Sequence, residues 1–316
     1  MLLALRALKL GDLLVAVPAL RGLRRGFPGH EIVLAAPDWL APIAALVEGV
    51  DALLPTPGLD RRLPLERGSV DIAANLHGNG ARSRELIEAL DARLRIVHRS
   101  EDAPEADPGA PPWIDGVLER ERWARLVRAY GAPAEADDVA IRVPTVPAPA
   151  LGAAVIHVGA AHGSRRWPVD RFAEVAVALA AEGLRPVITG GEADRERALA
   201  VAGLAGVAER DVTAGRMGLG EFAALVSGAS LVITADTGAG HLASAYRTPS
   251  VVIFGPAPPE EWGPPPGPHR ALTVSALRRG DVFAEDPDPA LLAVRASDVL
   301  AAARALLAAP APGCGR

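Results

Sequence analysis

One segment of the chain combines residues that could bind an anion. The apolar, β-branched run Leu231–Ala235 is followed at once by Asp-Thr-Gly, a pattern that predicts a buried strand, a tight turn and a helix start. A helix that begins with small residues leaves its first backbone N–H groups uncovered, and these donors, with the positive end of the helix dipole, favour an anion. The plain alternative is an ordinary connection with a capping side chain. The candidate binding residues are Asp236, Thr237, Gly238, Gly240 and His241.

Two arginines follow the end of another predicted strand. The run Ala153–Val158 leads into a loop of small residues and then into Arg165 and Arg166. Small residues let a ligand approach the backbone, and guanidinium groups supply positive charge and paired donors for phosphate oxygens. A solvated arginine pair would look the same in the sequence, but a loop that follows a strand is where a ligand is expected.

Two further positions in the second half could hold a nucleotide. Glu192 follows a strand end and two glycines, where it could accept hydrogen bonds from a ribose or a base. As an alternative, it is an acid in the first turn of the next helix. Met217 precedes another predicted helix and could pack on a flat ring, although packing in the core is the more common role of methionine.

The first half offers a candidate general base. Asp12 follows Gly11 at the start of the first predicted helix. There it either caps backbone donors or, at the edge of a ligand site, takes a proton from a hydroxyl group. A polar turn that contains Asn75 and His77 ends a later strand and suits acceptor binding, although ordinary turn residues would look the same.

These residues all follow apolar runs, and such runs alternate with helical patterns along the chain. The alternation predicts doubly wound α/β domains, each with a parallel sheet covered by helices on both faces. Proline-rich residues 142–150 interrupt it and predict a linker. We expect an N-terminal domain over 1–145, a C-terminal domain over 151–285 with a ligand cleft between the two sheets, and a last helix over 290–309 that returns toward the N-terminal domain.

The pattern also predicts the individual elements. The predicted strands are Leu2–Leu8, Glu31–Ala36, Ala52–Leu54, Ile72–Asn75, Leu94–His98, Ala153–Val158, Arg185–Thr189, Leu231–Ala235 and Ser250–Phe254. The predicted helices are Asp12–Gly26, Trp39–Val47, Ser83–Leu90, Trp113–Tyr130, Val169–Glu182, Asp194–Gly203, Leu219–Gly228, Ala239–Tyr246 and Leu291–Ala308.

Composition narrows the function classes. The chain has 316 residues, half of them hydrophobic, and its formal net charge of −5 argues against a general nucleic-acid partner. The single cysteine, Cys314, excludes an intrachain disulfide and a cysteine-based zinc site. Charged residues interrupt the apolar N-terminus, so we expect a cytoplasmic protein with neither a secretory signal nor stable membrane insertion.

Taken in order, these segments resemble glycosyltransferase family 9, whose best-known members are the ADP-heptose:lipopolysaccharide heptosyltransferases. The resemblance covers almost the whole chain. Its motifs are Gly11-Asp12 with Val17–Leu20, Arg165–Pro168, Gly190–Glu192 with Met217, Asp236–Leu242 and Phe254–Pro256. The resemblance implies a GT-B fold, made of two Rossmann-like domains, with the acceptor in the N-terminal domain and a nucleotide-sugar donor, ADP-linked, in the C-terminal one. It also implies an inverting transfer that needs no metal or other cofactor.

The resemblance further implies a role for the candidate residues. Asp12 matches the catalytic base of the family. Arg165 stands where members commonly carry a lysine that faces the diphosphate, a change that keeps the charge and alters its geometry. Glu192 matches an acid that binds the nucleoside, and Met217 matches a residue against the base. The residues that match the donor-binding turn are Asp236, Thr237, Gly238 and His241.

Other functions remain open at this stage. A nucleotide-sugar 2-epimerase on a related fold would convert a free nucleotide sugar without an acceptor. A non-catalytic binding protein would hold the donor without turnover. Within the transferase hypothesis, the acceptor is either lipopolysaccharide, another envelope glycan or a small natural product, and the sequence does not choose among them.

Overall fold

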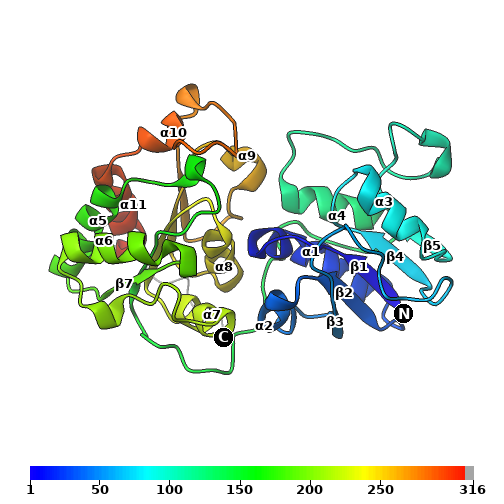
Figure 1. Cartoon of the computed structure of the whole chain (residues 1–316), viewed down its shortest axis with the longest axis horizontal. Helices are drawn as coiled ribbons and strands as arrows, with labels where there is room; N and C mark the ends of the chain where they lie inside the picture. The colour runs from blue at the N-terminus through cyan, green and yellow to red at the C-terminus, as the bar shows by residue number, and fades with distance from the viewer. Residues whose placement is uncertain (310–316) are drawn as a thin grey trace. The chain divides into compact units, whose positions relative to one another are not determined.

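The computed structural model describes residues 1–309 and divides into two compact units (Figure 1). The N-terminal unit is Met1–Arg142, and the C-terminal unit begins at Val143. Each unit holds one five-stranded sheet, and all strand pairs within the two sheets are parallel. The predicted fold class, α/β with two doubly wound sheets, is therefore confirmed. Cys314 lies outside the described residues.

The N-terminal sheet brings two of the candidate residues to one edge. Its strands are β1 (Leu2–Leu5), β2 (Ile32–Ala36), β3 (Ala52–Pro55), β4 (Ile72–Asn75) and β5 (Leu94–Ile96). They lie in the order β3-β2-β1-β4-β5, so the direction of winding reverses between β1 and β4. Loops that follow these two neighbouring strands leave the same edge of the sheet, where doubly wound folds bind ligands. Asp12 follows β1 and His77 follows β4.

The helices of the N-terminal unit are α1 (Leu10–Gly26), α2 (Ala41–Ala44), α3 (Ala81–Glu88) and α4 (Glu119–Ala129). In Figure 1, α1 lies alongside α4, and the two helices pack on each other. Glycine makes this approach possible, because a Cβ on Gly22 would lie 2.7 Å from the Cβ of Ala134, just beyond α4.

Two predicted helices of this unit are shorter in the structure. The helix predicted from Trp113 begins only at Glu119, because Gly116 adopts a left-handed φ of 68° that interrupts the helical pattern. The helix predicted over Trp39–Val47 is a 3-10 turn, Asp38–Leu40, followed by the single turn of α2.

The C-terminal sheet has the same kind of strand order, with one reversal in the direction of winding. Its strands are β6 (Ala154–His157), β7 (Pro186–Thr189), β8 (Leu231–Ala235), β9 (Ser250–Ile253) and β10 (His269–Leu272). Their order is β10-β9-β8-β6-β7, so the reversal falls between β6 and β8. The loop with Arg165 follows β6 and the turn with Asp236 follows β8, which places them next to each other at one edge.

Strand β10 was not predicted. It follows a proline-rich stretch, and its sequence, His-Arg-Ala-Leu, carries only two apolar residues. It lies at the edge of the sheet and pairs only with β9, where Arg270 and Ala271 are exposed. An edge strand needs little apolar surface, so the hydrophobic pattern on which the prediction relied is weak there.

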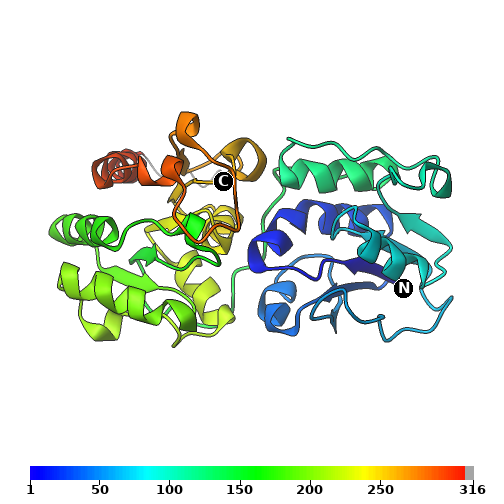
Figure 2. The same cartoon turned by 45° about the horizontal axis from the view of Figure 1, so that its top comes forward.

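The helices of the C-terminal unit surround this sheet. They are α5 (Val169–Ala181), α6 (Arg195–Ala205), α7 (Leu219–Ser227), α8 (Gly238–Tyr246), α9 (Pro259–Trp262), α10 (Pro289–Leu292) and α11 (Ala296–Ala308). Helix α5 packs against both α6 and α11, and Figure 2 shows it between them.

In the last part of the described chain, two helices stand in place of the single predicted helix. A single helix was expected from Leu291, but the chain forms α10 and then α11, which begins where Arg295 donates its backbone N–H to Asp298. The return of this helix toward the N-terminal domain stays a prediction. Val299 and Ala303 are buried in the C-terminal core, and α11 packs on α5, β9 and β10, because its apolar face completes the cover of this sheet.

Candidate functional site

Arg165 and Asp236 are brought together at the edge of the C-terminal sheet. The Arg165 Nη1 atom lies 3.3 Å from the Asp236 Oδ2 atom and donates a 3.3 Å hydrogen bond to the Asp236 carbonyl oxygen. Asp236 is buried, whereas the Arg165 side chain remains 27% exposed. The buried carboxylate therefore orients a guanidinium group that a ligand can still reach.

The turn that follows is both a helix cap and the edge of a pocket. The Thr237 Oγ1 atom caps α8 by accepting a 3.3 Å hydrogen bond from Ala239 N, and it also shares a 2.9 Å hydrogen bond with Thr234 Oγ1. The plain interpretation of Thr237 as a cap is thus correct. Gly238 is partly exposed at the first turn of α8.

Gly240 has a packing role. A Cβ at this position would lie 3.1 Å from the Val252 Cγ2 atom, so the glycine lets α8 approach β9. Its neighbour His241 is partly exposed, and the His241 ring meets the Trp262 ring edge-on at 6.4 Å. One pocket is lined by Asp236, Thr237, Gly240, His241, Ser244, Val252, Phe254, Trp262 and Pro264.

Glu192 and Met217 belong to two loops that touch each other. Gly215 N donates a 3.2 Å hydrogen bond to Gly190 O, and a Cβ on Gly215 would lie 2.9 Å from the Glu192 Cα atom. The Glu192 side chain is exposed and Met217 is half-buried. Glu192 and Asp194 both lie in the first turn of a 3-10 helix, Glu192–Asp194, and the Asp194 Oδ2 atom accepts from Gly191 N at 2.9 Å.

The two arginines of the loop, Arg165 and Arg166, differ in exposure and in their surroundings. Arg166 is exposed, and its charge, after burial, lowers the pKa of the Arg197 guanidinium. Arg165 is held by its loop, since Ser164 donates through N to Ala284 O at 2.8 Å and through Oγ to Val282 O at 2.9 Å. Gly163 fits against the same segment, because a Cβ there would lie 1.5 Å from Glu285 O.

The second group of candidate residues lies in the N-terminal unit. Asp12 sits in the first turn of α1 beside the partly exposed Gly11, and its Oδ2 atom accepts a 3.1 Å hydrogen bond from Lys9 N. The capping interpretation therefore holds for one carboxylate oxygen. The other oxygen, Oδ1, lies 3.6 Å from the Arg6 Nη2 atom, and the Asp12 side chain is 25% exposed. One side chain thus combines a cap with an accessible carboxylate.

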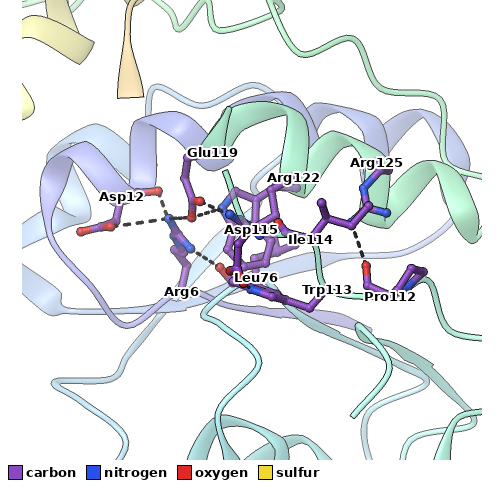
Figure 3. A network of polar contacts seen from close by, with 11 residues as sticks. Arg6, Asp12, Leu76, Pro112, Trp113, Ile114, Asp115, Glu119, Arg122 and Arg125 are labelled. Carbon is purple, nitrogen blue, oxygen red and sulfur yellow. Dashed lines mark hydrogen bonds and ion pairs between the residues drawn. The ribbon is translucent and has the colours of Figure 1, made fainter. Parts of the chain in front are cut away.

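Arg6 is a residue that the sequence interpretation missed. Its guanidinium lies between the carboxylates of Asp12 and Glu119 and donates to the carbonyl of Leu76 (Figure 3). Burial lowers the pKa of the Arg6 guanidinium, and the charges of Asp12 and Glu119 oppose that effect. The sequence did carry one indication of a role for Arg6, because it is the single charged residue inside the apolar run Leu2–Leu8.

The predicted acceptor residues Asn75 and His77 differ in their surroundings. Asn75 is buried, its Nδ2 atom donates to Ser83 Oγ at 3.1 Å, and its Oδ1 atom accepts from His77 N at 3.2 Å. The Asn75 amide therefore shapes the turn that precedes His77, and its role in acceptor binding stays a prediction.

His77 lies close to Asp12 and Arg6. Burial and then the charge of Arg6 lower the pKa of His77 to about 4, while Asp12 acts in the opposite direction. The imidazole is therefore neutral at neutral pH. Its Nδ1 atom is buried and has no hydrogen-bond partner among residues 1–309.

Two general features were searched over the same described part of the chain. No group of three or more His, Cys, Asp or Glu side chains there could hold a metal ion. None of the helices there is long and apolar enough to cross a membrane.

The chain is similar to known proteins in sequence and in fold. Residues 136–280 match the family model described as glycosyltransferase family 9 (heptosyltransferase). Lipopolysaccharide heptosyltransferase 2 of Escherichia coli (strain K12) is 25% identical, over 94% of this chain and 95% of its own. The solved structure of E. coli ADP-heptose LPS heptosyltransferase II aligns with a TM-score of 0.77 and 20% identity, over 97% of this chain and 98% of that one.

A second solved structure, E. coli heptosyltransferase WaaC with ADP, aligns with a TM-score of 0.68 and 19% identity, over 85% of this chain and 92% of that one. These likenesses confirm the GT-B fold. The family model spans the motifs from Arg165 to His241, and the sequence similarity to heptosyltransferase 2 extends over nearly the whole chain. The resemblance to family 9 is confirmed, and the similar proteins indicate that the chain is a glycosyltransferase.

Proposed function

We propose that the protein transfers a heptose or a related sugar from an ADP-linked donor to a hydroxyl group of a glycan acceptor, with inversion and without a metal. The observation that carries the proposal is the ion pair of Arg165 with Asp236 at the start of α8. It supports a diphosphate site made of a held guanidinium and a helix N-terminus. The related structure of WaaC, which contains ADP, supports an adenosine diphosphate donor.

The donor would use the other residues of the C-terminal unit. The exposed Glu192 carboxylate can accept hydrogen bonds from a ribose or a base, and Met217 can pack on the ring beside it. His241 and Thr237 lie on the pocket at the start of α8 and are proposed as phosphate or sugar contacts. Arg166 is exposed and would contribute long-range charge only.

The chemistry is a single displacement. The acceptor oxygen attacks the anomeric carbon from the face opposite the diphosphate, the carbon–oxygen bond to the diphosphate breaks, and ADP leaves with the electron pair. Asp12 takes the proton of the attacking hydroxyl. Arg165 and the N-terminus of α8 stabilise the charge that develops on the leaving diphosphate, a task that a divalent metal performs in other enzymes.

The acceptor is proposed to be a lipopolysaccharide core, because the similar proteins are lipopolysaccharide heptosyltransferases. His77 is proposed as its contact beside Asp12, since the neutral imidazole can accept or donate a hydrogen bond to a hydroxyl. Gly11 would let the acceptor approach the backbone at the start of α1.

Replacing Asp12 by Asn tests the base. Asparagine can still accept from Lys9 N and keep the helix start, but it cannot take a proton. We expect the transfer rate from ADP-heptose to lipopolysaccharide that lacks heptose to fall about 10²–10⁴-fold. The dissociation constant for ADP, measured by calorimetry, should stay within about twofold.

Two outcomes would contradict this assignment. Undiminished transfer by the Asp12→Asn variant would remove Asp12 from the base role. A loss of ADP binding would point to a structural role instead. If the unaltered protein converts ADP-heptose into another nucleotide sugar without an acceptor, the transferase proposal itself fails and the epimerase alternative takes its place.

A further inference from the structure

Arg6 is a buried cation beside the proposed base. Its side chain is 1% exposed and follows β1 directly. The Nε atom donates a 2.9 Å hydrogen bond to Asp12 O, and Nη1 donates to Leu76 O. The guanidinium also lies over the Trp123 ring, 4.7 Å from its centroid. These contacts fix the position of the group but leave one nitrogen unused.

That nitrogen, Nη2, is buried and has no hydrogen-bond partner among the described residues. It lies 3.6 Å from Asp12 Oδ1 and 3.6 Å from Glu119 Oε1 (Figure 3). At this separation the attraction is electrostatic, and it acts on two carboxylates at once. One guanidinium group thus attracts both the partly exposed Asp12 carboxylate and the Glu119 carboxylate, whose side chain is 13% exposed.

The remaining charges around Asp12 come from two other elements. Arg122, on α4 as is Glu119, donates from Nε to Glu119 Oε2 at 2.8 Å and repels Arg6. His77, after β4, is affected by both Arg6 and Asp12. The backbone N–H of Lys9 completes the environment of the carboxylate. The Arg6 charge thus lies 3.6 Å from the outer oxygen of Asp12, and Glu119, at the same distance from Arg6, competes for it.

We propose that Arg6 is a positioning residue that orients the Asp12 carboxylate and stabilises its negative charge, and that Glu119 on α4 sets the strength of this effect. The inference rests on the proposed function, in which Asp12 is the base. A base must lose its proton before it can accept one from the acceptor, and it must point in one direction. Arg6 supplies both conditions from the interior, without touching the substrate.

The test compares variants that change the charge in opposite directions. Arg6→Gln removes the cation 3.6 Å from the carboxylate, so the Asp12 carboxyl should titrate at a higher pH than in the unaltered protein. Glu119→Gln removes the competing carboxylate, so it should titrate at a lower pH. Arg6→Lys keeps the charge and loses the paired donors, so the titration should stay near the original while kcat falls about tenfold.

The titration is read by ¹³C NMR of protein labelled at the aspartate carboxyl carbons, with the Asp12 signal identified by its loss in Asp12→Asn. Arg120→Gln is the matched control. Arg120, which lies on α4, is buried as Arg6 is, but it pairs with Asp137, 3.0 Å away. It should leave the Asp12 titration unchanged. The pH profile of kcat should move with the titration in each variant.

Opposite shifts in Arg6→Gln and Glu119→Gln support the inference, whereas unchanged titration in both, or shifts in the same direction, overturn it. If Arg6→Gln does not fold, Glu119→Gln decides alone, and a titration that does not move to lower pH overturns the inference. The proposed function fails separately, if Asp12→Asn retains transfer. The NMR result does not depend on the choice of acceptor, so the two failures are distinguishable.

Discussion

Arg165 and Arg6 both hold a guanidinium against an aspartate, but they differ in exposure and therefore in role. Arg165 is 27% exposed, so it can meet a ligand, while Arg6 is 1% exposed and can act only through Asp12. Two of the contacts that these arginines make join distant parts of the sequence and are not visible in it. Arg165 and Asp236 are 71 residues apart, and Arg6 and Glu119 belong to elements separated by most of the N-terminal unit.

The difference between the two arginines of the donor loop leads to a first prediction. Arg165→Ala should weaken ADP binding about 10- to 100-fold, because hydrogen bonds to charged groups contribute roughly 1.5–3 kcal/mol each. Arg165→Lys should retain part of the affinity, since it keeps the charge but not the fork. Calorimetric titration with ADP measures both, and UDP and GDP serve as comparison nucleotides.

The matched control is the neighbouring residue. Arg166→Ala removes an equal charge from an exposed position that does not contact Asp236, so it should change ADP affinity less than threefold. Equal losses in Arg165→Ala and Arg166→Ala would show that the loop attracts the nucleotide by its total charge. The ion pair with Asp236 would then have no special part in binding.

At the scale of elements, α1 must approach the chain beyond α4 closely enough for Arg6 to reach both Asp12 and Glu119. Gly22 sits at the closest point, buried on the face of α1 that meets α4 and Ala134. Without a Cβ the helix can approach the opposing backbone, and a larger residue would separate the two elements.

We therefore expect Gly22→Ala to destabilise the N-terminal unit by about 1–3 kcal/mol, since the added Cβ would lie 2.7 Å from that of Ala134. Thermal unfolding measures the effect. Gly203→Ala is the control, because Gly203 lies inside α6 with no atom within 4 Å of an added Cβ. It should stabilise by roughly 0.5–1 kcal/mol through helix propensity. A stabilising Gly22→Ala would contradict the close packing.

The elements themselves were largely predictable from the sequence. Nine of the ten strands follow from apolar runs, because central parallel strands are buried on both faces. Edge strand β10 and the late start of α4 were not, since one lacks the apolar run and the other depends on the turn at Gly116. Most of the candidate donor residues were readable because they follow a strand, whereas Arg6 and Glu119 required the fold.

At the scale of the whole molecule, each unit holds two histidines that burial keeps neutral. Burial lowers the pKa of His98 to about 3 in the N-terminal unit and that of His269 to about 4 in the C-terminal unit. His77 and His157 behave similarly, with pKa values of about 4. In the unfolded chain all four would titrate near pH 6.5.

This arrangement predicts how stability depends on pH. Between about pH 6.5 and 4 the unfolded chain binds more protons than the native one. The contribution of the four neutral histidines to the free energy of unfolding is therefore fully present above pH 6.5 and is lost as the pH falls toward 4. At pH 5 the loss is at most roughly 2 kcal/mol per histidine. Urea unfolding followed by tryptophan fluorescence at pH 7 and pH 5 measures it.

A substitution of His98 tests this pH dependence of stability most directly. Its two ring nitrogens are buried without a hydrogen-bond partner in the described part of the chain, and its ring meets those of Trp113 and Trp123 edge-on at 5.0 and 5.8 Å. His98→Phe should therefore keep the packing, lose no hydrogen bond and reduce the loss of stability at pH 5. A variant with unchanged pH dependence would show that His98 is not a source of it.

The support of Arg165 by residues 282–285 has a consequence for the order in which the protein matures during synthesis. Ser164 donates to Val282 O and Ala284 O, and Gly163 fits against Glu285. All donor-side motifs have left the ribosome well before this segment does. The nascent C-terminal unit therefore carries every proposed ligand contact while the loop of its main arginine still lacks the backbone partners that fix it. In the proposed function, the nucleotide site is therefore completed by a stretch of chain to which no ligand contact is assigned.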